Sequence, residues 1–235
     1  VTGGNVSLYN ETKDVNNNIQ PIHPTPIIGM VGLIENLENF CTQSWQKEND
    51  FIYLLGVSLE TSDTLDKRLS LSATAYLEYI HNLVTGRPPE VDLKFEETVQ
   101  SFLRIMISNN LINSAHDISD GGLAIALAES SISSSLGCSI DLPNSPQRID
   151  RLLFAEGGSR IIVSISPEND NKLIQKLEAF NSSLQIPLQL TKIGHVKNNN
   201  LEINFKNKKL VDLHIIEMKK CFENSIPNRI NPTNL

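Results

Sequence analysis

Hydrophobic and polar positions along the chain form blocks of two kinds, some with helical spacing and some with the character of strands. Apolar side chains recur at helical spacing in three stretches, at residues 69–83, 95–107 and about 212–224. Apolar runs predict strands at residues 27–35, 51–57, 138–142, 161–165, 188–196 and 201–205. Two further helices are predicted after the start signals Asp120 and Ser166. Because helices and strands mix without a strict repeat, we expect an α+β fold in which helices cover one side of a mainly antiparallel or mixed sheet.

The segment before the buried strand at 51–57 is too short to close a hydrophobic core of its own. We therefore predict a domain boundary there, with residues 1–48 as the tail of one domain and residues 49–235 as a second domain. One domain with a long N-terminal arm is the alternative. Within the tail, the asparagine-rich residues 13–20 are expected to form a surface loop. The chain starts at Val1, without methionine, so we expect a fragment of a longer protein.

The amino-acid composition limits which binding partners and which cellular compartment we expect. The 235 residues are 40% hydrophobic, which is enough for a sizeable core. Lys and Arg number 20 against 27 Asp and Glu, and the basic residues are scattered, so we expect neither nucleic acid nor a membrane surface as a partner. Three widely spaced cysteines predict reduced thiols and a cytoplasmic location. No run approaches the roughly 18 apolar residues of a membrane span.

Residues 115–129 join a polar turn to a helix rich in small side chains. Asp120 can cap the backbone amides at the helix start, and the glycines that follow let another backbone or a phosphate approach. A carboxylate such as Asp117 beside a phosphate is repulsive unless a cation such as Mg²⁺ bridges them, and Ser119 could then donate to a phosphate oxygen. From spacing alone, turn and cap roles for the two aspartates are the alternative.

The residues at the start of the chain also have two interpretations, a ligand site or an ordinary turn. Glycines such as Gly4 let backbone amides approach a ligand, and the side-chain oxygen of Asn5 is a hard donor suited to Mg²⁺. Ser7 offers a hydroxyl on the same face if the chain is extended. An ordinary turn is the alternative.

Residues 156–160 juxtapose an acid, Glu156, and a base, Arg160, across a glycine turn. The turn either binds a ligand or carries a solvated ion pair, which would contribute little to stability. His116 precedes the acidic cluster, but no serine or cysteine nucleophile with a matching partner can be named. The sequence therefore gives no catalytic residue.

Four motifs in this order resemble the C-terminal third of the phosphoribosylformylglycinamidine synthase family: residues 4–12 (GNVSLYNET), 24–35 (PTPIIGMVGLIE), 115–124 (AHDISDGGLA) and 154–160 (FAEGGSR). The resemblance implies the end of an N-terminal-type domain followed by a complete C-terminal-type α+β domain of the superfamily that includes aminoimidazole ribonucleotide synthetase. The whole enzyme of that family uses ATP and glutamine-derived ammonia to convert formylglycinamide ribonucleotide into formylglycinamidine ribonucleotide in purine synthesis.

The resemblance also implies roles for individual residues. Gly4 would contact ATP, Asn5 would ligate Mg²⁺, and Ser7 would contact the ribonucleotide substrate. Asp117 and Ser119 match residues that bind Mg²⁺ and an auxiliary nucleotide in large single-chain relatives. Residues 156–158 align with a substrate-binding Glu-Ser-Gln of the first repeat, and the change to Glu-Gly-Gly implies that this copy has lost the role.

The partners implied are the missing N-terminal part of the same enzyme and, in the multi-subunit type, a glutaminase subunit and a small accessory subunit. The catalytic histidine of the family lies in that missing part, so we expect the fragment alone to be inactive. Two other hypotheses remain: a noncatalytic nucleotide-binding or scaffold module, and another member of the same superfamily.

Overall fold

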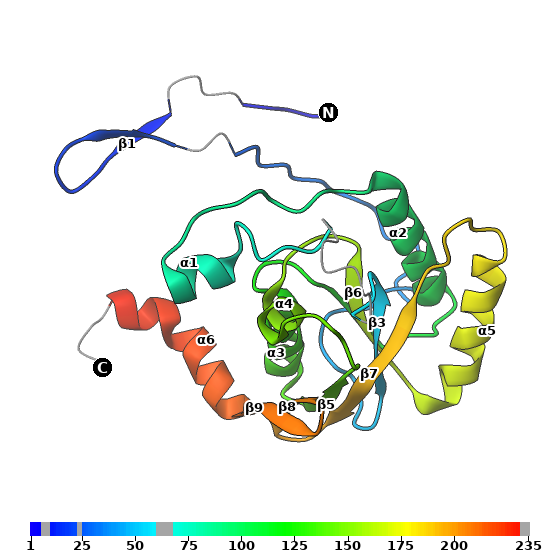
Figure 1. The fold of residues 1–235 in the computed structure, drawn as a ribbon. Coiled ribbons are helices and arrows are strands. Elements are labelled where there is room, and N and C mark those ends of the chain that lie inside the picture. The colour runs from blue at the N-terminus through cyan, green and yellow to red at the C-terminus, as the bar shows by residue number, and fades with distance from the viewer. Residues whose placement is uncertain (6–9, 23–24, 60–67, 231–235) are drawn as a thin grey trace. The chain divides into compact units, whose positions relative to one another are not determined.

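The computed structural model describes residues 1–5, 10–22, 25–59 and 68–230. These residues divide into two compact units, an N-terminal unit, Val1–Leu37, and a C-terminal unit, Glu38–Leu235. Figure 1 shows the ribbon of both units. Each unit is described by itself.

The N-terminal unit contains one small hairpin. Strand β1 (Glu11–Lys13) pairs antiparallel with β2 (Ile19–Pro21). The Asp14 carboxylate accepts hydrogen bonds from the amides of Asn16 and Asn18, both at 2.8 Å, and so closes the turn. The predicted surface loop at 13–20 is therefore the turn of a hairpin together with parts of its two strands.

The strand predicted at residues 27–35 does not form. This segment has no assigned strand, and its large apolar side chains are exposed, with Ile27 at 95% and Met30 at 91%. Its apolar pattern is that of a strand, but a strand also requires a neighbour to satisfy its backbone groups. Among the described residues no strand pairs with it, so the prediction was wrong for this structure.

A sheet of seven strands forms the centre of the C-terminal unit. Its strands in spatial order are β4 (Ser114–Asp117), β6 (Arg160–Ile165), β3 (Phe51–Gly56), β7 (Leu190–Lys197), β5 (Gly137–Leu142), β8 (Asn200–Phe205) and β9 (Lys208–His214). All neighbours are antiparallel except β5 and β8, which run parallel. The predicted mixed sheet is thus confirmed.

Helices cover both faces of this sheet. The helices of the C-terminal unit are α1 (Ala75–His81), α2 (Leu93–Ser108), α3 (Gly122–Ser134), α4 (Ile149–Phe154), α5 (Asp170–Asn181) and α6 (Ile215–Ile230), with a short 3₁₀ turn, η1 (Pro167–Asn169), before α5. All of them except α1 place buried side chains in the core against the sheet. Ile52 and Leu54 of β3 join the core under α3, α4 and α6, whereas Tyr53 and Leu55 join the core under α2 and α5. Figure 1 shows the two groups of helices on opposite sides of β3, β6 and β7.

The α+β class is confirmed, but the expectation that helices cover one side of the sheet was wrong. Successive side chains of a strand point to opposite faces. Because both sets of β3 side chains are apolar and buried, each face needs its own cover of helices. The all-apolar run of β3 was the signal for a strand that is buried on both sides.

Two elements differ from their predicted bounds. The helix predicted from about 212 begins only at Ile215, because the preceding residues form β9 and pair with β8. The helix predicted over 69–83 is limited to α1, where Thr74 caps the first turn by accepting from the Leu77 amide at 3.3 Å. Asn82 ends it in the left-handed conformation, with φ 54°.

Trp45 connects the start of the C-terminal unit to its core. The indole is buried, and its Nε1 donates to the hydroxyl of Ser131 on α3 at 3.2 Å. The domain boundary between residues 48 and 49 stays a prediction. The position of Trp45 supplies a way to test that boundary.

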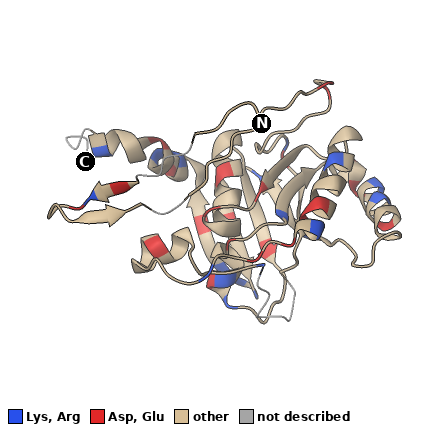
Figure 2. Cartoon of the chain, turned by 90° about the horizontal axis from the view of Figure 1, so that it is seen from above, with Lys and Arg blue, Asp and Glu red and all other residues tan. Residues whose placement is uncertain are grey.

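Charged residues are distributed over several helices and strands, as Figure 2 shows. No helix within the described ranges is both long enough and apolar enough to cross a lipid bilayer.

Candidate functional site

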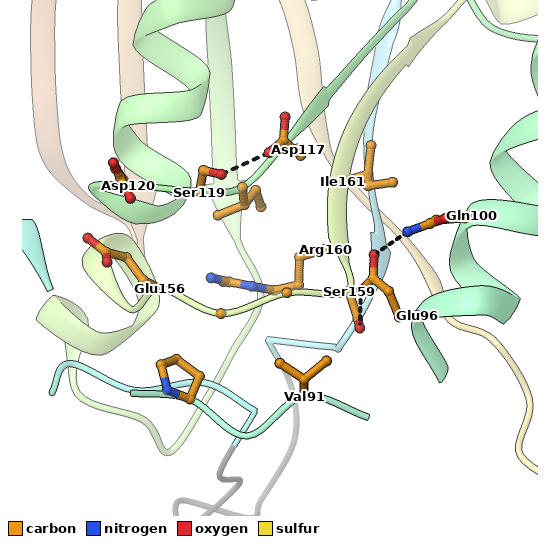
Figure 3. Close-up of a pocket in the computed structure, with 14 residues that line it drawn as sticks. Val91, Glu96, Gln100, Asp117, Ser119, Asp120, Glu156, Ser159, Arg160 and Ile161 are labelled. Carbon is orange, nitrogen blue, oxygen red and sulfur yellow. Dashed lines mark hydrogen bonds between the residues drawn. The ribbon is translucent and has the colours of Figure 1, made fainter. Parts of the chain in front are cut away.

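An open cleft of about 600 Å³ lies in the C-terminal unit, where β4 ends and β6 begins. Asp117 and Ile161 are partners in the antiparallel pairing of these strands, so the turn after β4 and the turn before β6 meet at the same edge. The cleft is lined by Pro89, Val91, Glu96, Gln100, Asp117, Ile118, Ser119, Asp120, Glu156, Gly157, Gly158, Ser159, Arg160 and Ile161. Figure 3 shows how these side chains surround it.

Asp117 and Ser119 lie together on the rim of the cleft. The Ser119 hydroxyl donates to Asp117 Oδ2 at 2.8 Å. The Asp117 side chain is 70% exposed, so its carboxylate faces solvent while its position is held. The two residues that the sequence singled out in this stretch therefore form one polar pair (Figure 3).

Asp120 does not cap helix α3, so this expectation was wrong. Gly121 takes the N-cap position, with φ 79°, and no side chain of that residue can cap the helix. Glu156 fills the role from another part of the chain, since its Oε1 accepts from the Gly121 amide at 2.8 Å. The same Oε1 accepts from the Ala75 amide in the first turn of α1 at 2.9 Å.

Glu156 therefore connects the starts of two helices. A carboxylate at a helix N-terminus is stabilised by the unpaired amides and by the helix dipole. In this structure the protein itself supplies that negative group at the start of α3. A phosphate would have to displace the carboxylate to bind the Gly121 amide.

The expected solvated ion pair between Glu156 and Arg160 does not form. Arg160 is 1% exposed, and its Nη2 donates to the carbonyl oxygen of Ala155 at 2.6 Å, just after α4. Within the described part of the chain no ion pair joins Arg160 to Glu156, and its buried Nε and Nη1 have no hydrogen-bond partner there. Burial lowers the pKa of the Arg160 guanidinium to about 10, and the charge of Arg151 acts in the same direction.

A carboxylate on another wall of the cleft accepts one hydrogen bond at each of its oxygens. Glu96 of α2 accepts from the Ser159 hydroxyl at 2.6 Å and from the Gln100 side-chain amide at 2.9 Å. Sequence reasoning missed Glu96 and Gln100, although their spacing of four residues on a helix was a signal that they share a face. Nothing in the sequence indicated that Ser159 would reach them.

The charge of the cleft suits a cation better than a bare anion. Four carboxylates line it, those of Glu96, Asp117, Asp120 and Glu156, against the one buried guanidinium of Arg160. Among the residues that the structure describes, no group of three or more His, Cys, Asp or Glu side chains could hold a metal ion. Mg²⁺ commonly uses one or two carboxylates and takes its other ligands from water and phosphate. Asp117, exposed and held by Ser119, fits that mode of binding.

The remaining predicted site residues lie in the N-terminal unit. Gly4 and Asn5 are exposed, and a Cβ added at Gly4 would meet nothing within 4 Å. Ser7 lies outside the described residues. The structure therefore brings Asp117 and Ser119 together, and the roles of Gly4, Asn5 and Ser7 stay predictions.

The mixed sheet with helices on both faces and the acidic cleft at its edge define the class of the chain, an α+β domain with an open polar cleft. The family model of the AIR synthase related protein, C-terminal domain, matches residues 47–203. The chain belongs to this family.

Several relatives share the name phosphoribosylformylglycinamidine synthase subunit PurL. The protein of Prochlorococcus marinus strain SARG / CCMP1375 is 52% identical over 234 residues, which is 99% of this chain and 30% of that protein. The protein of strain MIT 9313 is 51% identical over 98% of this chain and 29% of that protein. The chain thus spans about 30% of the length of the curated relatives it matches.

Solved structures agree on the fold. The structure of PurLQS from Thermotoga maritima has a TM-score of 0.58 at 13% identity, covering 78% of this chain and 28% of that chain. T. maritima PurL complexed with FGAR has a TM-score of 0.58 at 14% identity, covering 78% of this chain and 30% of that chain. T. maritima PurL complexed with ATP has a TM-score of 0.56 at 13% identity, covering 78% of this chain and 28% of that chain.

Proposed function

We propose that the chain is the C-terminal part of a phosphoribosylformylglycinamidine synthase. The whole enzyme would convert formylglycinamide ribonucleotide, ATP and glutamine-derived ammonia into formylglycinamidine ribonucleotide, ADP and phosphate, in cytoplasmic purine biosynthesis. The observation that carries this proposal is the 52% identity, over 99% of the chain, to a relative of that name. Because the chain covers 30% of that relative, it supplies only part of the active enzyme.

The N-terminal unit would contribute ligands to the main active site. Gly4 would contact ATP, Asn5 would ligate Mg²⁺ through its side-chain oxygen, and Ser7 would contact the ribonucleotide substrate. The hard oxygen donor of Asn5 suits Mg²⁺, which supports this assignment. The remainder of the enzyme would supply the catalytic histidine, and a glutaminase subunit with a small accessory subunit would supply ammonia in the multi-subunit type.

The C-terminal unit would serve as a scaffold that holds an auxiliary Mg²⁺–nucleotide at Asp117 and Ser119. The exposure of Asp117 and its hydrogen bond from Ser119 support this role. When bound, Mg²⁺ would neutralise repulsion between the acidic cleft and the phosphates of the nucleotide. A noncatalytic nucleotide-binding module is the second candidate function, and the same cleft favours it.

The test of the first proposal compares this chain alone with the chain joined to the preceding part of the enzyme. ATP turnover is measured with formylglycinamide ribonucleotide and ammonia. We expect no turnover from the chain alone, turnover from the joined enzyme, and loss of that turnover in Asn5→Ala. Asn16→Ala, in the hairpin turn, is the matched control and should retain it. An inactive joined enzyme would refute the proposal.

The second function is tested by calorimetry of the chain alone with Mg-ADP. A nucleotide-binding module binds Mg-ADP and loses affinity in Asp117→Ala. If Mg-ADP does not bind, or if Asp117→Ala does not change its affinity, the proposal of an auxiliary nucleotide site is refuted.

A further inference from the structure

Four polar side chains form a row of contacts that starts at the rim of the cleft, with Ser119 and Asp117, and continues through His116 to Glu129 on α3. The Ser119 hydroxyl donates to Asp117 Oδ2 at 2.8 Å, and Asp117 Oδ1 lies 3.4 Å from His116 Nδ1. On the other side of the ring, His116 Nε2 lies 2.9 Å from Glu129 Oε2. Each oxygen of Asp117 and each nitrogen of His116 therefore has a polar neighbour.

The exposure of the side chains changes sharply along this row of contacts. The Asp117 side chain is 70% exposed, whereas the His116 side chain is only 13% exposed. Glu129 lies on α3, which is anchored to the core by the buried side chains of Leu123 and Leu127. A mostly buried ring, in contact with a packed helix, thus lies beside an exposed carboxylate.

We propose that His116, held by Glu129, is a positioning residue for the Asp117 carboxylate. This inference rests on the proposed role of Asp117 toward a Mg²⁺–nucleotide. Groups behind a metal ligand fix the orientation of that ligand, and removing them typically lowers metal affinity by about 10-fold to 100-fold. His116 and Ser119 constrain Asp117 from two sides, and the outward faces of its oxygens remain available to a hydrated cation.

A purely structural role of His116 would make a different prediction. The contact between His116 and Glu129 also joins β4 to α3, and its loss could weaken the fold without any effect on Asp117. A positioning residue acts only through the group that it positions. Its substitution should therefore matter when Asp117 is present and have no effect when the Asp117 carboxylate is absent.

The experiment is a double-mutant cycle on the 235-residue chain, with Mg-ADP affinity measured by calorimetry and thermal unfolding measured in parallel. We expect His116→Gln to weaken Mg-ADP binding by about 10-fold to 100-fold and to have no further effect in the Asp117→Asn background. His195→Gln, an exposed histidine on β7, is the matched control and should bind like the unaltered chain.

Three outcomes would overturn the inference. The first is unchanged affinity in His116→Gln, and the second is an equal loss with and without Asp117. The third is an Asp117→Asn variant that binds Mg-ADP as well as the unaltered chain, which identifies a failure of the proposed nucleotide role itself. If His116→Gln does not fold, Glu129→Gln replaces it in the cycle with the same expected result.

Discussion

The Glu156 carboxylate caps helix α3, because its Oε1 accepts a hydrogen bond from the backbone amide of Gly121 at 2.8 Å. The same atom accepts from the Ala75 amide at 2.9 Å, so one side chain serves the starts of α1 and α3. Ala75 is 81 residues away from Glu156 in the sequence, and Gly121 is 35 residues away. The loop that contains Glu156 thus has a structural role, since it connects the starts of two helices.

Glu156→Ala should destabilise the C-terminal unit by roughly 1–3 kcal/mol, since loss of one side-chain cap typically costs about 0.5–2 kcal/mol. Glu156→Gln retains an acceptor oxygen and should lose less, mainly the charge interaction with the helix dipoles. Urea denaturation measures both. Glu178→Ala on the exposed surface of α5 is the matched control and should change stability little. Equal stability of all three variants would contradict the capping role.

Gly157→Ala should be far more damaging than Gly158→Ala. Gly157 has φ 147°, and a Cβ there would collide with the carbonyl oxygen of Arg68. A Cβ at Gly158 would meet only the flexible end of Glu96, at 3.3 Å. We expect a loss of at least about 2 kcal/mol for Gly157→Ala, because a strained backbone conformation alone costs about 1–3 kcal/mol.

Gly158→Ala is the internal control for this pair and should lose less than about 1 kcal/mol. Denaturation of both variants in urea gives the comparison. Similar losses for the two would show that the close approach of residue 68 does not constrain the loop.

Much of this fold follows from local sequence patterns. The helix predicted at 95–107 is α2, Leu93–Ser108, and the run at 51–57 is β3, Phe51–Gly56. In both cases the spacing of apolar side chains matches the face that the element buries. Helix α4, with six residues, is too short to show a period. The residues of β9 fit a helix as well as a strand until β8 pairs with them.

The candidate site was harder to predict because its contacts are not local. The pair of Asp117 and Ser119 can be predicted from the sequence. The two residues are only two positions apart, so their side chains can meet without any contact to a distant part of the chain. The sequence predicts Asp120 as the cap because an aspartate just before a helix commonly caps it, but the N-cap position is taken by Gly121. Only the folded sheet brings Glu156 to that position, by pairing β6 with β4 and so joining the turns at their ends.

Asp50→Asn should change how stability depends on pH. Asp50 is fully buried just before β3, and its Oδ2 accepts from the Asn113 side chain at 2.7 Å. Burial raises the pKa of the Asp50 carboxyl, although the hydrogen bond from Asn113 opposes this shift. The folded state therefore binds the proton more tightly than the unfolded state, and this contribution to stability is lost as pH rises through the folded-state pKa.

Asparagine cannot titrate, so the substitution removes this loss. Relative to the unaltered protein, Asp50→Asn should gain stability between about pH 4 and about pH 7, the range above the ordinary carboxyl pKa. Urea denaturation of both proteins at the two pH values gives the difference. A stability difference that is constant with pH, or that moves in the opposite direction, would contradict the raised pKa.

Truncation at two positions should locate the domain boundary. The core clusters of the described residues begin at Cys41 and Trp45, and none of their members comes from residues 1–37. Deletion of 1–37 should leave the thermal unfolding of the remainder nearly unchanged. Deletion of 1–48 also removes Trp45 and its bond to Ser131, and loss of a buried tryptophan side chain typically costs about 3–5 kcal/mol. Circular dichroism follows the unfolding of both variants, and fluorescence of Trp45, the single tryptophan, also follows that of the shorter deletion.

Equal unfolding temperatures for the two truncations would support the predicted boundary after residue 48. A large loss of stability only in the longer deletion would instead move that boundary to the N-terminal side of Trp45.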